Sequence, residues 1–347
     1  MIDIKKLNHW QAPKNWYEIQ TIDAHTGGEP LRIIISGFPK LEGDTLLKKR
    51  ANAKKKFDQI RKTLMLEPRG HADMYGAIIV EPDTPDADFG VIFIHNEGYS
   101  TGCGHAVIAL TKIFIETGLI KKTEPITEVK MDVPSGFIRS FAEVKHGKII
   151  NIGFHNVPSF VQQMDSIINI PELGKIQYDL AFGGAFYAFV DTAQLNLDCT
   201  EKYHDQLIEK GVLIKKAIAE SILMDHPTEP EMNFLYGTIF TGPPKNLKNH
   251  SRNVCIFAEG EVDRSPTGTG VSARAAIHYS RGEISIGESI TIESIIGSTF
   301  SVKVDDVTTF GKYNAIIPEV RGNAFITGKN LFWINPNDPL KDGFILR

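Results

Sequence analysis

The sequence predicts an α/β protein built from two similar halves, each with a curled sheet around a central helix. Three observations lead to this fold class. Short runs rich in branched residues alternate with helical stretches along the chain. The helix expected after Cys103 is apolar on nearly every side, which is typical of a helix enclosed by other structure. A set of small-residue turns occurs twice at similar spacings, which indicates an internal repeat.

The composition is that of an ordinary globular protein and excludes several other classes. Of the 347 residues, 42% are apolar and 23% are charged, so the chain is neither disordered nor fibrous. This length fits two domains or one large one. The formal net charge is −4 and the isoelectric point about 6.3, whereas a protein that coats nucleic acid or an acidic membrane is usually strongly basic. We therefore expect no nucleic-acid partner and no membrane partner.

The cysteines and the N-terminal sequence bear on the cellular compartment. Cys103, Cys199 and Cys255 lie far apart and form neither a disulfide framework nor a Cys-x-x-Cys pair. Such sparse cysteines are typical of a reducing compartment. The N-terminus lacks an apolar segment of signal-peptide length, and no run of about 18 apolar residues is present. The sequence thus predicts a cytoplasmic protein.

The first third of the chain contains three expected strands and a helical stretch. The strands are 32–36, 77–80 and 91–94, each bounded by Gly, Pro or Asp. Residues 44–66 form an amphipathic pattern of one or two helices, with Asp44 as the expected cap and Pro68 beyond the end. This stretch carries a basic cluster, which we interpret as a solvated helix face rather than a nucleic-acid site. The cluster consists of Lys48, Lys49, Arg50, Lys54, Lys55 and Lys56.

The internal repeat divides the chain into halves at 1–177 and 178–347. In each half a Gly-Gly turn precedes a strand, a small-residue turn then opens a helix, and a β-like segment with a glycine follows. The spacing from the second Gly of the pair to the helix start is 75 residues in the first half and 83 in the second. The paired segments are 26–28 with 182–184, 100–105 with 264–270, and 133–137 with 296–300. The first half carries Cys103, and the second carries Asp263 and Thr267.

Both repeated helices begin at glycine-rich turns, which suits the binding of a small anion. Two helix N-termini that face each other present unpaired backbone N–H groups and the positive ends of two dipoles, which favour a carboxylate. Cys103 lies at one such start, where the dipole is expected to lower the pKa of a thiol and make it a base or nucleophile. The alternative is a small buried cysteine, which is how we interpret Cys199 and Cys255.

Two further residues near the helix starts are candidates for binding. Asp263 lies four residues before Thr267 and could hold the ammonium of a zwitterion, or act as a turn or ion-pair partner of Arg264. His105 could supply a backbone amide, whereas a lone histidine is more often structural. The histidines are too dispersed for a metal motif, and no glycine-rich nucleotide-binding motif is present. We expect no metal and no cofactor.

Five ordered blocks of the sequence resemble the proline racemase family. They are DAHTGGEPLR (23–32), EPRGHADMYGAI (67–78), HNEGYSTGCGHA (95–106), FGGAFYAFVD (182–191) and DRSPTGTGVSAR (263–274). The resemblance runs almost end to end. It implies the diaminopimelate-epimerase-like fold, in which two α/β halves are related by a pseudo-twofold axis, and this agrees with the internal repeat.

The resemblance also implies an activity, which depends on position 267. Racemases and 4-hydroxyproline epimerases of the family carry a cysteine at both turns, and the second position here is Thr267. Members with this Cys/Thr pair resemble trans-3-hydroxy-L-proline dehydratases, hydro-lyases that need no cofactor and yield the cyclic imine Δ1-pyrroline-2-carboxylate. A threonine hydroxyl titrates too high to replace a thiol. The alternatives are a proline racemase or 4-hydroxyproline epimerase, and a non-catalytic binder of cyclic amino acids.

The resemblance assigns roles to the residues at the two turns. Cys103 is the expected base, and Asp263 is expected to bind the ring ammonium. Thr267 either hydrogen-bonds the departing hydroxyl or only fills space. Gly102 stands where the family usually has a bulkier Met, which affects the shape of the pocket. Backbone N–H groups that bind the carboxylate are expected at Gly104, His105, Gly268 and Thr269. The expected partner is a small cyclic amino acid, and a homodimer is compatible with the sequence.

Overall fold

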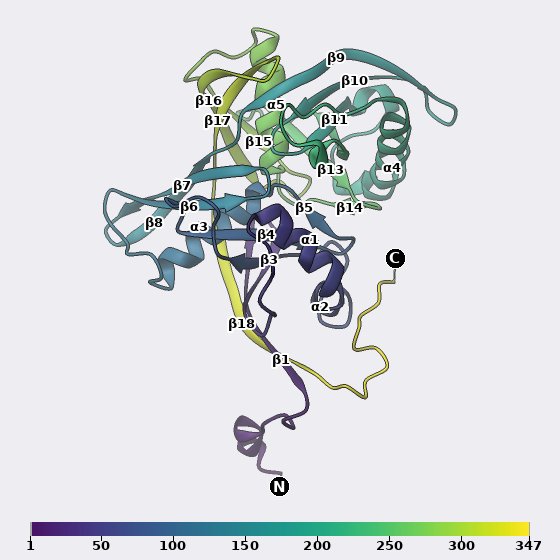
Figure 1. Ribbon diagram of the computed structural model, residues 1–347. Helices are drawn as coiled ribbons and strands as arrows, with labels where there is room; N and C mark the ends of the chain where they lie inside the picture. Colours follow the sequence, from purple (N-terminus) through teal and green to yellow (C-terminus); the bar gives the residue numbers. More distant parts are fainter. Residues whose placement is uncertain (1, 347) are drawn as a thin grey trace.

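The computed structural model describes residues 2–346. They form curled sheets around two central helices (Figure 1). The strands are β1 (Tyr17–Thr26), β2 (Glu29–Ser36), β3 (Tyr75–Val80), β4 (Phe89–His95), β5 (Tyr99–Ser100), β6 (Ile126–Val133), β7 (Gly136–Lys145), β8 (Lys148–His155), β9 (Ser159–Ile170), β10 (Gly174–Phe182), β11 (Phe186–Asp191), β12 (Leu235–Gly242), β13 (Ser251–Phe257), β14 (Glu261–Val262), β15 (Ser289–Glu293), β16 (Thr299–Phe310), β17 (Tyr313–Gly322) and β18 (Ala324–Ile334). The α-helices are α1 (Leu46–Lys56), α2 (Asp58–Met65), α3 (Gly104–Glu116), α4 (His204–Ser221) and α5 (Gly268–Ser280), and the short 3-10 helices are η1 (Ile4–His9), η2 (Thr192–Leu195), η3 (Glu201–Tyr203) and η4 (Pro230–Met232).

The strands form two curled units that share β17. One unit runs β18–β1–β2–β3–β4–β6–β7–β8, with β8 pairing with β17. The other runs β9–β10–β11–β12–β13–β15–β16–β17 and closes on itself, because β17 also pairs with β9. The last strand, β18, therefore pairs with the first strand of the chain. The division of the chain at residue 177 stays a prediction.

Each unit encloses one helix of 13 residues, as the sequence predicts. Helix α3 contacts β1, β7, β8 and β18, whereas α5 contacts β9, β10, β16 and β17 (Figure 1). In α3 only Lys112, Phe114 and Glu116 are not fully buried. A helix surrounded in this way loses apolar surface to the sheet on every side, which accounts for its lack of a polar face.

The glycine turns of the repeat adopt matching conformations. Gly28 has a φ of +93° immediately before β2, and Gly184 has a φ of +103° shortly before β11. A residue with a side chain rarely adopts this left-handed conformation. The repeated Gly-Gly pairs are thus explained by the same sharp turn in both halves.

The expected elements of the first third are confirmed, with one correction. The three predicted strands lie within β2, β3 and β4, and the helical stretch is divided into α1 and α2. The cap of α1 is Thr45 rather than Asp44, because the Thr45 side chain accepts a hydrogen bond from the N–H of Lys48. Asp44 instead forms an exposed ion pair with Lys48 at 2.7 Å.

The basic cluster on α1 is only partly a solvated face. Lys54, Lys55 and Lys56 are exposed, whereas the Lys49 ammonium is buried and donates to the carbonyl of Glu81 at 2.7 Å. Arg50 also turns inward and donates to the carbonyl of Tyr99 at 2.8 Å. None of the helices within residues 2–346 is long and apolar enough to cross a bilayer.

Candidate active site

The N-termini of the two central helices meet backbone to backbone. Cys103 is the N-cap residue of α3, and Thr267 is the N-cap residue of α5. A Cβ atom added to Gly268 would lie 2.5 Å from the Cα of Gly104, and one added to Gly104 would lie equally close to Gly268. Only two glycines allow this approach. It directs the unpaired N–H groups of both first turns toward one point.

A small closed cavity lies at this meeting point, and all seven residues that the sequence predicts for the site line it. The cavity measures about 20 Å³, room for one or two water molecules and far less than a five-membered ring with its carboxylate occupies. Bringing such a molecule in therefore requires the halves to part. The predicted residues in its wall are Cys103, Gly104, His105, Asp263, Thr267, Gly268 and Thr269. Their roles stay predictions.

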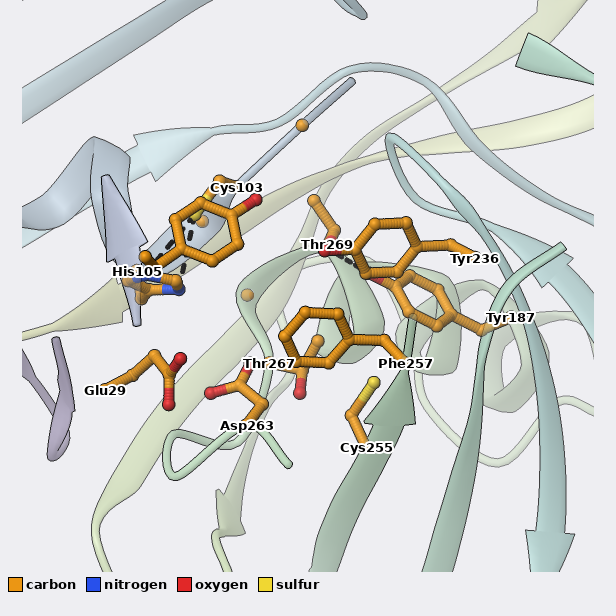
Figure 2. Close-up of a pocket in the computed structure, with 14 residues that line it drawn as sticks. Glu29, Cys103, His105, Tyr187, Tyr236, Cys255, Phe257, Asp263, Thr267 and Thr269 are labelled. Atoms are coloured by element: carbon orange, nitrogen blue, oxygen red, sulfur yellow. Dashed lines mark hydrogen bonds between the residues drawn. The ribbon is translucent and has the colours of Figure 1, made fainter. Parts of the chain in front are cut away.

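Cys103 and His105 form one side of the cavity (Figure 2). The Cys103 thiol lies 3.3 Å from Nδ1 of His105 and accepts a hydrogen bond from the N–H of Ala106. Burial lowers the pKa of His105 to about 3, so its ring is neutral. The Thr26 hydroxyl donates to the carbonyl of His105 at 2.8 Å, which ties this first turn to β1.

The expected low pKa of the Cys103 thiol is wrong for the closed structure. Complete burial raises its pKa well above the ordinary value, and the nearby carboxyl groups of Asp263 and Glu29 raise it further. The Ala106 N–H at the helix start opposes this but does not outweigh it. The helix dipole can be inferred from the sequence, whereas desolvation depends on how tightly the two halves close.

Asp263 is a buried carboxyl group that points into the cavity (Figure 2). Burial raises its pKa to about 6, whereas hydrogen bonding from Ser265 lowers it. Its Oδ1 accepts the N–H of Ser265 at 2.7 Å. Arg264 forms an ion pair with Asp73 rather than with Asp263. Its guanidinium lies 2.8 Å from the carboxylate of Asp73.

Thr267 adopts a conformation that is unusual for its residue type. Its φ is +68°, which for a β-branched residue costs on the order of 1–3 kcal/mol. The Thr267 N–H donates to the Ser265 hydroxyl at 3.1 Å, and Asn253 holds the carbonyl of Pro266 at 3.2 Å. These contacts aim the Thr267 side chain toward Asp263 and Cys255.

The other residues of the wall were not predicted from the sequence. They are Glu29, Tyr75, Gly102, Tyr187, Tyr236, Cys255 and Phe257, of which the sequence analysis noted only Gly102 and Cys255. A Cβ atom on Gly102 would lie 3.1 Å from the Ser135 hydroxyl, so a larger residue there requires its neighbours to shift. The Tyr187 hydroxyl forms a hydrogen bond of 2.7 Å with the Thr269 hydroxyl (Figure 2). Tyr75 falls inside a block that carries the family resemblance, which is the one signal that could have found it.

Cys255 requires a correction to its predicted role as an ordinary buried cysteine. Its thiol is fully buried, as expected, but it lines the cavity on the same side as Thr267 (Figure 2). Burial raises its pKa well above the ordinary value, and the nearby carboxyl group of Asp263 raises it further. Cys199 lies outside this wall and donates to the carbonyl of Phe240 at 3.6 Å. All three cysteines are free.

Carboxylates and histidines that could hold a metal gather elsewhere. Within residues 2–346, His155, Asp305 and Glu319 bring ligand atoms close together. Lys303 already pairs with both carboxylates, at 2.8 Å and 3.1 Å.

Sequence comparison places these features in a known group. Residues 21–345 match the family described as proline racemase. The chain belongs to the proline racemase family. It is 49% identical to a protein named trans-3-hydroxy-L-proline dehydratase from Colwellia psychrerythraea, over 99% of this chain and 97% of that protein. It is 45% identical to a protein named 3-hydroxyproline 2-epimerase from Burkholderia multivorans, over 95% and 98%.

A solved structure of the proline racemase family confirms the predicted fold class. A hydroxyproline epimerase from Agrobacterium vitis, crystallised with trans-4-hydroxy-L-proline, superposes with a TM-score of 0.90 at 32% identity. The match covers 96% of each chain. The pair of curled sheets around central helices is therefore the architecture of this family.

Proposed function

We propose that this protein removes water from trans-3-hydroxy-L-proline without a cofactor. The observation that carries the proposal is the unlike pair at the two helix starts, with a thiol at Cys103 and a hydroxyl at Thr267. The name of the Colwellia relative supports it, and five further relatives at 42–45% identity have equivalent names. The protein is accordingly a hydro-lyase.

Substrate binding uses the two helix starts and Asp263. The carboxylate lies against the N–H groups at Gly104, His105, Gly268 and Thr269, where two dipoles favour negative charge. Asp263 accepts a hydrogen bond from the ring ammonium. Both contacts acidify the α-carbon, because they stabilise the negative charge that develops when its proton leaves.

The bound ammonium also prepares the Cys103 base. In the free site, burial raises the pKa of the thiol, and the negative charge of Asp263 adds to this effect. A cation bound against Asp263 cancels that charge. Substrate binding thus favours the thiolate at the moment when a base is needed.

Elimination follows because no thiol occupies the second helix start. Cys103 takes the α-proton, and the electron pair of the Cα–H bond forms a double bond to C3 as the C3–O bond breaks. The product is an enamine, which tautomerises to the cyclic imine. In a racemase, a second acid would instead return a proton to the other face of Cα.

The experiment that tests this proposal is product analysis with the purified protein. Trans-3-hydroxy-L-proline, L-proline and trans-4-hydroxy-L-proline are each incubated with it, and the imine is detected as its adduct with o-aminobenzaldehyde. We expect imine from the 3-hydroxy compound alone. Inversion of either other amino acid, with no imine formed, contradicts the proposal.

A second candidate is epimerisation at Cα of 3-hydroxyproline. It is favoured by the thiol of Cys255 in the cavity wall and by the name of the Burkholderia multivorans relative. Cys255 lies in β13 rather than at a helix start, which argues against direct proton delivery. Solvent deuterium at Cα with inverted configuration, abolished in Cys255→Ala, would establish this activity in place of the dehydratase.

The proposal extends to the setting in which the protein works. Its substrate is a free cyclic amino acid, its location is the cytoplasm, and its assembly is a homodimer. Size-exclusion chromatography with light scattering tests the assembly, since a monomer has a mass of 38.6 kDa.

A further inference from the structure

The stereochemistry of the substrate determines where water leaves, provided that the proposed function holds. In trans-3-hydroxy-L-proline the carboxylate and the 3-hydroxyl lie on opposite faces of the ring. The α-hydrogen and the 3-hydroxyl therefore lie on the same face. If Cys103 removes the α-hydrogen, the hydroxyl departs on the side of Cys103. Thr267 belongs to the other helix start and lies on a different side of the cavity (Figure 2).

The Cys103 side contains a pair of buried hydroxyl groups that the proposed function does not use. Tyr75, the first residue of β3, lines the cavity and is 2% exposed. Its hydroxyl forms a short hydrogen bond with the hydroxyl of Ser100, which is 1% exposed. The Tyr75 hydroxyl also lies near the Cys103 thiol. Its ring packs edge-on against His105, with 4.8 Å between ring centroids.

Two other polar side chains of the wall, His105 and Tyr187, are less suited to supply a proton to the hydroxyl. His105 is neutral because burial lowers its pKa to about 3, and its ring already contacts the Cys103 thiol. Tyr187 lies in β11, and its hydroxyl is paired with that of Thr269 on the opposite helix at 2.7 Å. Tyr75 is thus the phenol of the wall whose ring packs against His105, beside the base.

We propose that Tyr75, held by Ser100, binds the 3-hydroxyl of the substrate and relays the α-proton from Cys103 to it. Cys103 first takes the proton from Cα as a thiolate. The Tyr75 O–H then gives its proton to the departing hydroxyl while its oxygen receives the proton from the Cys103 thiol. The C3–O bond breaks with its electron pair on oxygen, one water leaves, and Cys103 is again a thiolate.

The relay agrees with the electrostatics of the site. Burial raises the pKa of the Tyr75 phenol well above its ordinary value, so a free phenolate is costly there. If the Tyr75 oxygen receives a proton from Cys103 while its own proton moves to the departing hydroxyl, no phenolate forms. Thr267 then has no acid role, and its contribution is to leave the second helix start without a thiol that could return a proton to Cα.

Tyr75→Phe tests the relay because it removes one oxygen and keeps the ring. We expect kcat for imine formation to fall by about 10²–10³-fold, in the range for loss of an acid–base group. Loss of deuterium from [2-²H]-labelled substrate should change less than tenfold, since Cys103 still removes the α-proton. Ser100→Ala should lower kcat less, by about tenfold. Tyr187→Phe is the matched control, because it also removes one phenol oxygen from the cavity wall. In this variant we expect the rates of label loss and of imine formation to change by the same factor.

Three outcomes would overturn the relay. The first is a near-normal kcat in folded Tyr75→Phe. The second is that the rates of label loss and of imine formation fall equally in this variant, which would indicate that Tyr75 only positions Cys103. The third needs no variant: the wild-type protein dehydrates cis-3-hydroxy-L-proline, whose hydroxyl lies on the opposite face, as fast as the trans isomer. These differ from failure of the proposed function, in which the wild-type protein forms no imine from the trans isomer.

Discussion

The start of α3 and the start of α5 have the same architecture and opposite chemistry. Each opens a helix of 13 residues at a glycine, and each follows a glycine turn and a strand in a repeated order. At α3 the cap is a thiol in extended backbone, with φ at −156°. At α5 the cap is a threonine with φ at +68°, beside a buried carboxyl group. The two helix starts thus match in their backbone, whereas only the start of α3 carries a thiol.

Removal of the thiol at α3 is expected to have the largest effect. Cys103→Ser should lower imine formation by at least 10³-fold, because a serine hydroxyl is a far weaker base than a thiolate. The fold should be retained, since the change is nearly isosteric. Imine detection and thermal unfolding measure the two effects. Cys199→Ser, a thiol outside the cavity wall, is the control, and comparable activity in both variants would show that Cys103 is not the base.

A side chain at the junction of the two helices should damage both starts together. Gly268→Ala places a Cβ atom 2.5 Å from the Cα of Gly104, and overpacking of this kind costs about 1–3 kcal/mol of stability. We expect a lower Tm and a kcat/KM reduced by about 10²-fold, because the N–H groups no longer converge. Gly328→Ala, with nothing within 4 Å of the added Cβ, is the control. An unchanged Tm would mean that the close contact is not required.

The carboxyl group beside α5 should set the acidic limb of the pH profile. Burial raises the pKa of Asp263 to about 6, so below that pH the group is protonated and loses its charge. The neutral form cannot pair with the ring ammonium. We expect kcat/KM to fall about tenfold per pH unit below 6, since kcat/KM reports the free enzyme. A profile that is flat down to pH 5 would contradict this assignment of Asp263.

A thiol placed at the start of α5 should make the two helix starts more alike. Of the changes considered, we expect this one to have the smallest effect on activity. In Thr267→Cys both helix starts carry a thiol, and we expect slow inversion of L-proline, measured as solvent deuterium in D-proline. The rate depends on the distance and angle of the new thiol to Cα. The paired measurement is Thr267→Ser, in which no inversion should appear. Inversion in Thr267→Ser would show that a hydroxyl suffices.

Local patterns predicted most of the scaffold, and tertiary packing determined the rest. The repeat and the glycine turns predicted both central helices and brought seven candidate residues to one cavity. Tyr75 and Cys255 were missed as parts of that wall because strands β3 and β13, far apart in sequence, bring them there. The pKa direction of Cys103 was wrong for the same reason, since desolvation arises from closure of two halves that local sequence does not describe.

The tight junction between the halves has a consequence for chemical labelling. Iodoacetamide cannot reach the Cys103 thiol in this small cavity until the cavity walls separate. Alkylation of Cys103 then proceeds no faster than the protein opens, whatever the reagent concentration. The limiting alkylation rate at high reagent concentration therefore measures the rate of the opening step. A planar competitor such as pyrrole-2-carboxylate lowers this rate, because it stabilises the closed form.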